Sequence, residues 1–309
     1  MQYMTISIDF PKKTLQIIKY RQPNTTGWLS SFFFADMITF RMLAIVLILT
    51  CFYCHGSSYD SSRWCDLFNL RNCLNMNVNG KKAVIFGGTS GIGLATTKQL
   101  KELGADVIAI SRNPEKGMDI PDSVTLKKCD VLDRDHVQTV LEECAPYDIL
   151  VSAATGGARA VGPFLEMDMD GYQGSFDKLW GYANVIRYGT NFLSNNGAIV
   201  LVSGTPARKT KPGQVAIGSV GGAVETLVRA VAPEIAPKRI NILAPGTIDT
   251  PMVAFKGAER DKYYTKATAD NIIPRAGTPE EAAQGILFLI QNDFVTGTTV
   301  DVDGGWLLS

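Results

Sequence analysis

The segment whose residue types and spacing point most clearly to a binding function is a run of glycines and hydroxyl residues over positions 86–93, FGGTSGIG. It follows an apolar, β-branched stretch and precedes a stretch in which apolar residues have helical spacing. Glycines at such a turn let the backbone approach a phosphate closely, and the first N–H groups of the following helix attract an anion. The segment therefore predicts a dinucleotide-binding turn, with contacts from Gly87, Thr89, Ser90, Gly91, Ile92 and Gly93.

The elements that must position this turn alternate between strand-like and helix-like patterns from residue 81 onward. Such alternation favours βαβ units, in which helices cover both faces of a parallel sheet. The predicted fold class is α/β, a doubly wound parallel sheet in a single domain with an N-terminal extension. The expected strands are 82–86, 106–110, 124–131, 147–154, 197–203 and 240–244, and the expected helices are 93–103, 134–144, 175–193 and 215–235.

Further motifs follow the glycine turn along the chain. Asp130 and Val131 come after the third expected strand, segment 245–251 reads PGTIDTP, and segments 295–297 and 302–306 read VTG and VDGGW. Together with FGGTSGIG, these motifs resemble those of the short-chain dehydrogenase/reductase superfamily over residues 80–309. The resemblance implies a Rossmann-type domain that binds NAD(P), with adenine beside Asp130 and Val131 and nicotinamide beside 245–251. It adds these cofactor contacts: Ala153, Pro245, Gly246, Ile248 and Thr250.

The residues near position 112 bear on which dinucleotide binds. NAD-binding folds of this type place an acidic residue about 20 residues after the glycines, on the ribose 2′-hydroxyl. Here the corresponding zone reads Ile110-Ser111-Arg112-Asn113 and contains no carboxylate. A guanidinium such as that of Arg112 holds a 2′-phosphate by charge-assisted hydrogen bonds. The sequence therefore favours NADP over NAD, with Ser111 and Arg112 at the phosphate.

The residues that the family uses for proton transfer are missing at the expected spacing. The resemblance implies an Asn, a Ser, a Tyr and a Lys, of which the tyrosine exchanges a proton with the substrate oxygen. Ungapped spacing puts Ile217 at the tyrosine position and Gly221 at the lysine position. No Tyr-x-x-x-Lys occurs between residues 203 and 237, so a small slip in the spacing does not restore the pair.

Lys178 and Ser203 are the preferred catalytic candidates. The family's serine position falls on Gly204, one residue after Ser203, and its asparagine position falls near Lys178. A desolvated lysine has a lowered pKa and can act as an acid or a base near neutral pH. The serine hydroxyl is suited to orient a substrate oxygen. The remaining candidates are Thr205, Tyr182, Tyr188, Arg208 and Lys209.

Three functions fit this pattern. The favoured one is an NAD(P)(H)-dependent oxidoreductase that acts on a carbonyl/alcohol or enone substrate with non-standard catalytic residues, because hydride chemistry belongs to the cofactor. The alternatives are a catalytically inactive NADP-binding sensor or partner subunit, and a non-redox lyase or isomerase. The apolar and aromatic loop at about 251–275 predicts a moderately apolar small-molecule substrate. The family resemblance implies a homodimer or homotetramer.

The first 79 residues form a separate leader. Residues 42–54 run for thirteen positions without a charge, and the apolar segment over about 37–54 is marginal for a membrane span, which needs about 20 residues. Five basic residues precede the run and few closely follow it. This charge pattern predicts a signal or anchor segment and a membrane-associated or secretory protein. The alternative is a cytoplasmic protein whose leader packs on the domain.

Composition excludes several other classes. Lys+Arg and Asp+Glu number 30 each among 309 residues, so the chain lacks the basic excess of a nucleic-acid-binding protein. A hydrophobic fraction of 46% is typical of a globular protein. Cys51 and Cys54 have no His or Cys partners at zinc-ligand spacing, so no metal site is predicted.

Overall fold

The computed structural model describes residues 2–10, 13–21, 29–33, 76–155, 157 and 159–309, and the chain divides into two compact units, Met1–Leu70 and Arg71–Ser309. In the first unit, β1 (Gln2–Phe10), β2 (Lys13–Arg21) and β3 (Leu29–Phe33) pair as an antiparallel three-stranded sheet. The sequence patterns did not predict these strands. The predicted apolar segment at 37–54 lies outside the described residues. Among the helices that are described, none combines the length and the apolar character that a bilayer crossing requires.

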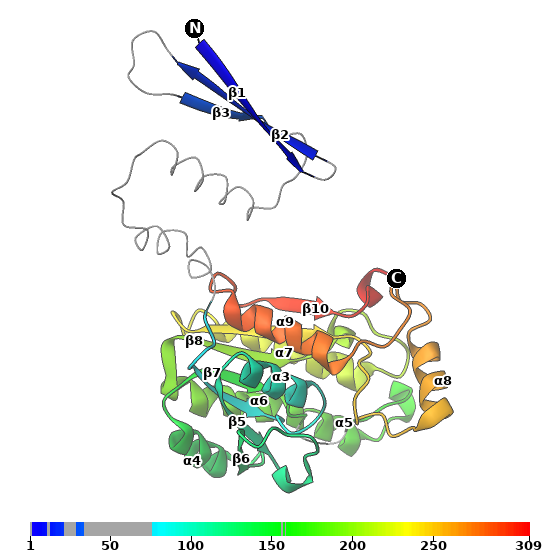
Figure 1. The fold of residues 1–309 in the computed structure, drawn as a ribbon. Helices are drawn as coiled ribbons and strands as arrows, with labels where there is room; N and C mark the ends of the chain where they lie inside the picture. Colours follow the sequence, from blue (N-terminus) through cyan, green and yellow to red (C-terminus); the bar gives the residue numbers. More distant parts are fainter. Residues whose placement is uncertain (1, 11–12, 22–28, 34–75, 156, 158) are drawn as a thin grey trace. The chain divides into compact units, whose positions relative to one another are not determined.

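The second unit is built on a seven-stranded parallel sheet with the strand order β10-β9-β8-β7-β4-β5-β6 (Figure 1). The chain starts at the centre with β4, moves outward to β6, returns to β7 and then moves outward to β10. This order confirms the predicted doubly wound sheet. The strands are β4 (Lys82–Phe86), β5 (Asp106–Ser111), β6 (Thr125–Lys128), β7 (Tyr147–Ser152), β8 (Leu193–Val202), β9 (Arg239–Pro245) and β10 (Thr299–Val302).

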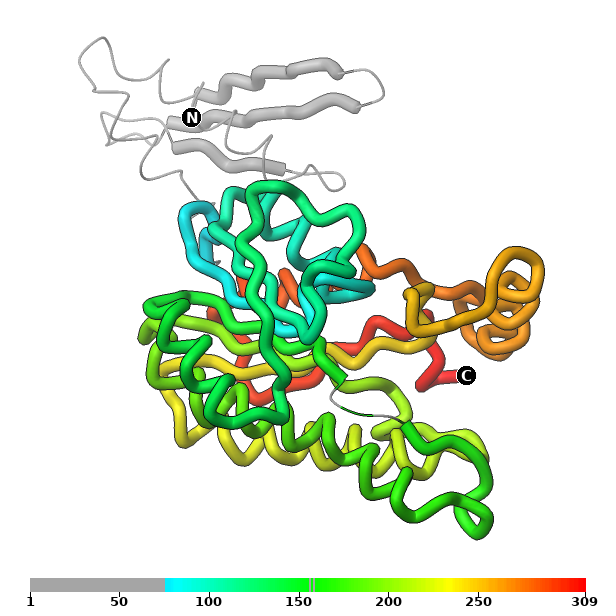
Figure 2. The backbone as a smooth tube through the Cα atoms, turned by 90° about the horizontal axis from the view of Figure 1, so that it is seen from below, coloured from blue at the N-terminus to red at the C-terminus, as the bar shows by residue number. Residues whose placement is uncertain are grey.

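Helices cover both faces of this sheet, as Figures 1 and 2 show. α3 (Gly91–Glu102) and α9 (Pro279–Gln291) pack together on one face, over Ala83 and Ile85 of β4. On the other face, α4 (Arg134–Cys144), α6 (Asp177–Gly189) and α7 (Val215–Val231) cover Val84 and Phe86. Because both faces are buried, the central strands are apolar at nearly every position rather than at alternate ones.

The helix predicted at 175–193 is shorter at both ends in the structure. It corresponds to α6, which begins at Asp177, directly after the separate short helix α5 (Met169–Ser175), and ends at Gly189 rather than at residue 193. The hydroxyl of Tyr147 donates a 2.7 Å hydrogen bond to the carbonyl oxygen of Gly189, and Leu193 already pairs with Tyr147 as the start of β8. Tertiary pairing with β7 therefore ends the helix although its apolar spacing continues.

The segment after β9 leaves the layered part of the unit. It contains α8 (Gly257–Ala267), drawn in orange at the edge of Figure 2, at the end of the unit where the C-terminus lies. The segment that follows α8 contacts the C-terminal segment directly, since the Asn271 amide donates a 3.4 Å hydrogen bond to the carbonyl oxygen of Asp303. The loop before α8 contributes Met252 and Val253, and α8 contributes Tyr263, to the lining of a cavity at the carboxyl edge of the sheet.

Candidate active site

A cavity of about 500 Å³ opens at the carboxyl edge of the sheet. Its lining residues follow the ends of five strands: Gly87 after β4, Ser111 at the end of β5, Ala153 after β7, Ser203 after β8 and Pro245 at the end of β9. β4 and β7 are neighbours in the sheet, and the chain winds away from them in opposite directions. Ligands of open α/β sheets bind at such a switch point.

The glycine turn forms the floor of this cavity and packs too tightly for side chains. Gly87 has a φ of +77°, a conformation that favours glycine, and its N–H donates to the carbonyl oxygen of Ile110 at 2.7 Å. A Cβ on Gly93 would lie 2.0 Å from the carbonyl oxygen of Gly87, so α3 begins in direct backbone contact with the turn. The N-cap Ser90 makes no side-chain capping bond, and the first turn of α3 has no acidic residue. The first N–H groups of α3 are thus available to an anion, which fits a diphosphate.

The end of β5 fits the adenosine ribose. The buried hydroxyl of Ser111 has no hydrogen-bond partner within the described part of the chain, and the side chain of Arg112 lies beside it on the cavity wall, exposed to solvent. A ribose bound at the end of β5 would supply the hydrogen-bond partner that this hydroxyl lacks. Val131 also lines the cavity, whereas the Asp130 carboxylate accepts a 3.0 Å hydrogen bond from the Leu132 N–H and is not part of the lining.

The opposite wall is the predicted segment 245–251, of which Pro245, Gly246, Ile248 and Thr250 line the cavity. Arg260 of α8 holds this wall in place. Its guanidinium forms an ion pair with Asp249 and donates to the carbonyl oxygens of Thr250 at 2.8 Å and of Phe255 at 3.1 Å. The loop that carries Met252 and Val253 into the cavity is therefore tied to α8 by one side chain.

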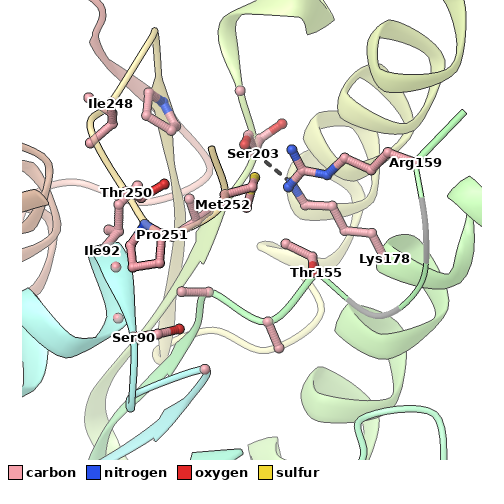
Figure 3. Close-up of a pocket in the computed structure, with 18 of the residues that line it drawn as sticks. Ser90, Ile92, Thr155, Arg159, Lys178, Ser203, Ile248, Thr250, Pro251 and Met252 are labelled. Atoms are coloured by element: carbon pink, nitrogen blue, oxygen red, sulfur yellow. Dashed lines mark hydrogen bonds between the residues drawn. The ribbon is translucent and has the colours of Figure 1, made fainter. Parts of the chain in front are cut away.

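Lys178 and Ser203 meet at the far end of the cavity. Figure 3 shows Lys178, from α6, with its amine directed at Ser203, on the side opposite Ile248 and Thr250. The Nζ donates a 3.2 Å hydrogen bond to the backbone carbonyl oxygen of Ser203, and the Ser203 hydroxyl donates a longer one, 3.4 Å, to the carbonyl oxygen of Gly221. The hydroxyl is therefore turned toward α7, while the carbonyl faces Lys178.

The environment of Lys178 makes its proton mobile. Burial disfavours the charged ammonium, and the nearby guanidinium of Arg159 adds repulsion, so that the pKa of Lys178 falls to about 7 from an ordinary 10.5. The Tyr182 ring lies 5.7 Å from the Nζ and offers only a weak cation–π contact. A lysine with such a pKa exchanges a proton at neutral pH.

Ile217 and Gly221, the positions that spacing assigned to the family's tyrosine and lysine, both line the cavity. Of the described residues that form the lining, Lys178 is the only lysine and Tyr263 of α8 is the only tyrosine. A Cβ on Gly221 would lie 2.9 Å from the Ala207 Cβ, so a longer side chain at position 221 has no room on this face of α7.

The other sequence candidates are engaged elsewhere. The hydroxyl of Tyr182 is buried and donates to the carbonyl oxygen of Val202 at 2.7 Å. Arg208 forms ion pairs with Asp301 and Glu225, and Lys209 donates to the carbonyl oxygen of Trp306 at 2.8 Å. None of these three side chains lines the cavity, and neither Thr205 nor Tyr188 does. The structure brings together only Lys178 and Ser203.

Sequence reasoning missed Arg159, which follows β7 and lines the cavity next to Lys178 (Figure 3). The available signal was its place in the loop after a central strand, since such loops surround the site in this fold. The described residues contain no cluster of three or more His, Cys, Asp or Glu that could hold a metal ion.

Known proteins are similar to this chain over most of its second unit. The profile of the family described as Enoyl-(Acyl carrier protein) reductase matches residues 87–307. "Carbonyl reductase family member 4" of Danio rerio is 32% identical over 237 residues, which are 72% of this chain and 96% of that protein.

Two solved structures add to the comparison. A small-chain dehydrogenase in complex with NADPH is 28% identical with a TM-score of 0.64, over 75% of this chain and all of the other. A short chain oxidoreductase from Pseudomonas aeruginosa, described as containing an atypical catalytic center, is 28% identical with a TM-score of 0.64, over 73% and 96% of the two chains. The parallel sheet, the glycine turn and these matches together make the chain a member of the short-chain dehydrogenase/reductase superfamily of NAD(P)-binding oxidoreductases.

Proposed function

We propose that the chain is an NADPH-dependent reductase of a carbonyl or enone substrate in which Lys178 acts as the proton donor. The observation that carries this proposal is the amine of Lys178 inside the cavity, held by the Ser203 carbonyl oxygen at 3.2 Å. The pKa of about 7 leaves a substantial fraction of the ammonium form at neutral pH. The relative named as a carbonyl reductase supports the reaction class.

Each residue then has a limited task. The glycine turn and the segment 245–251 would hold a reduced dinucleotide, which would supply the hydride for the substrate's carbonyl carbon. The Lys178 ammonium donates a hydrogen bond to the substrate oxygen, transfers its proton to it as the alcohol forms, and regains a proton from solvent. Ser203 acts as a positioning residue, because its backbone carbonyl keeps the amine directed into the cavity. Met252, Val253 and Ile217 supply an apolar wall beside the reacting atoms.

The preference for NADP over NAD rests on Ser111 and Arg112, and Arg112→Gln tests it. The substitution removes a charge-assisted contact to the 2′-phosphate, and we expect the Kd for NADPH to rise by about 10–100-fold. Affinity for NADH should stay nearly unchanged, because NADH has no 2′-phosphate. Nucleotide fluorescence titration measures both. Arg134→Gln removes an exposed arginine that does not line the cavity and is the matched control. Equal loss of NADPH and NADH affinity would contradict the assignment.

The direct test of the function is NADPH oxidation with a panel of ketones, quinones and enones. We expect turnover of at least some members by the full chain, with the alcohol or saturated ketone as product. Tight NADPH binding without turnover of any member would favour the catalytically inactive sensor or partner subunit. Conversion of a substrate without a change in the cofactor's oxidation state would favour the lyase or isomerase.

Two further features stay predictions. Assembly into a homodimer or homotetramer follows from the family resemblance, and light scattering of the purified chain measures it. The targeting role of the leader depends on segment 37–54, and fractionation of cells that express the full chain would show whether the protein follows membranes.

A further inference from the structure

The reactive end of the cavity carries positive charge only. Arg159 and Lys178 lie side by side there, and the residues that line the cavity include no aspartate and no glutamate. Figure 3 shows the two side chains converging beside Ser203. Arg159 is accessible to solvent and Lys178 is partly buried, so that a ligand entering the cavity meets the guanidinium first.

Neither cation has an acidic partner within the described part of the chain. Several other arginines there are paired, among them Arg208 with Asp301, Arg260 with Asp249 and Arg275 with Glu281. Arg159 and Lys178 form no such ion pair, and the guanidinium of Arg159 disfavours the charged form of Lys178. Like charges held together without a counter-ion destabilise the folded protein and are typical of functional sites. An anionic ligand would supply the missing countercharge.

The cofactor's phosphates already have a different binding place. The diphosphate fits the start of α3 at Ser90, and the 2′-phosphate fits Ser111 and Arg112. In Figure 3, Arg159 lies on the side of Lys178 and away from Ser90 and Ile92. An anion bound at Arg159 would therefore belong to the substrate rather than to the cofactor.

We propose that the substrate is an oxo acid, whose carboxylate is held by the Arg159 guanidinium while its oxo oxygen faces Lys178. This inference rests on the proposed function and adds the class of substrate to it. The planar guanidinium presents two parallel N–H groups to a carboxylate, a geometry that an ammonium does not reproduce. Met252, Val253 and Ile217 contact the rest of the molecule, so the substrate combines a carboxylate with an apolar body.

Binding tests this inference without requiring turnover. Phenylacetate and phenylacetamide have nearly the same shape and differ in charge, and calorimetry on the full chain saturated with NADPH compares them. We expect phenylacetate to bind at least about tenfold more tightly, because one charge-assisted pair is worth that much. Acetate, butyrate and cyclohexanecarboxylate, each with its amide, extend the series to other apolar bodies. If no carboxylate in the series binds better than its amide, the proposal is wrong.

The Arg159→Met variant assigns the preference to this residue. It should reduce the carboxylate-to-amide affinity ratio by about tenfold or more and leave the Kd for NADPH unchanged. Arg187→Met removes an exposed arginine on the same helix as Lys178 and is the matched control, with the ratio expected to be unchanged. A weaker NADPH affinity in Arg159→Met, with an unaltered ratio, would assign Arg159 to the cofactor and overturn the proposal.

Kinetics separates this inference from the proposed function. Benzoylformate and its methyl ester are compared as substrates, and the acid-to-ester ratio of kcat/KM is expected to be at least about ten in the wild type and to fall in Arg159→Met. Reduction of the ester with equal or greater efficiency would keep the reductase function and overturn the oxo-acid preference. Preferential binding of carboxylates without reduction of any carbonyl compound would keep the anion site and overturn the reductase function.

Discussion

Lys178→Met is expected to lower kcat for carbonyl reduction by about 100–10,000-fold, which is the usual contribution of a positioned acid. The substitution keeps the length and apolar stem of the side chain but removes the proton and the hydrogen bond to the Ser203 carbonyl oxygen. The Kd for NADPH should change little, since Lys178 lies at the substrate end of the cavity. Steady-state kinetics and nucleotide titration on the same preparation separate the two effects.

Dependence on pH gives an independent readout of the same residue. The pKa of Lys178 is lowered to about 7, so its ammonium form is present below that pH and is lost above it. The rate of reduction should therefore fall as pH rises through about 7. The reverse reaction, alcohol oxidation, needs the neutral amine and should become faster over the same range. A pH profile without this transition, or one that persists in Lys178→Met, would contradict the role of Lys178.

Two control variants show whether the lower kcat of Lys178→Met reflects a lost proton donor or a change in structure. Lys266→Met removes an exposed lysine on α8 and should behave as the wild type. Ser203→Ala removes the hydroxyl but keeps the carbonyl that binds Lys178, so its effect should stay below about tenfold. Folding of Lys178→Met should be intact. Burial lowers the pKa of Lys178, so the ammonium form is more stable in the unfolded chain than in the folded one, and the lysine destabilises the fold. Removing the lysine is expected to stabilise the fold by about 1–3 kcal/mol.

Gly93→Ala is expected to disrupt the glycine turn. Its Cβ would lie 2.0 Å from the Gly87 carbonyl oxygen, whereas ordinary contacts begin at 3.4 Å, so the start of α3 has to move away from the turn. Overpacking of this kind costs about 1–3 kcal/mol of stability. The displaced N–H groups no longer converge on a diphosphate, and we expect the Kd for NADPH to rise by about 10–100-fold. Thermal unfolding and nucleotide titration measure the two losses.

Gly222→Ala is the matched control for this substitution. Gly222 lies in α7, does not line the cavity, and a Cβ there would meet nothing within 4 Å. Alanine should stabilise the helix by about 0.5–1 kcal/mol and leave NADPH binding unchanged. Unaltered NADPH affinity in Gly93→Ala would exclude the proposed position of the diphosphate.

Local sequence predicts a feature well when the feature depends on neighbours along the chain. The glycine turn, the helix at 134–144 and the central strands were predicted with boundaries close to those observed, because backbone freedom and apolar periodicity are local properties. The edge strand expected at 124–131 is shorter, Thr125–Lys128, since it pairs with β5 on one side only. Fourteen of the fifteen predicted cofactor residues line the cavity, all except Asp130.

The N-terminal strands were not predicted, because their formation depends on pairing between segments rather than on neighbours along the chain. β2 pairs with β1 and with β3, and no motif in this segment marks the pairing. The leader's charge pattern and apolar run predict a signal or anchor segment, and they carry no information on the backbone hydrogen bonds before residue 34.

The sequence by itself determined the parallel sheet, the dinucleotide turn and the absence of a Tyr-x-x-x-Lys pair from the expected segment. Only the tertiary structure decided which of the remaining polar residues meet. It placed Lys178 and Arg159 in the cavity and used Arg208 and Lys209 to hold the C-terminal segment. The physical reason is that a side chain's charge and pKa respond to groups that lie close in space, and Arg159 and Lys178 are brought together by a loop and a helix that sequence spacing does not connect.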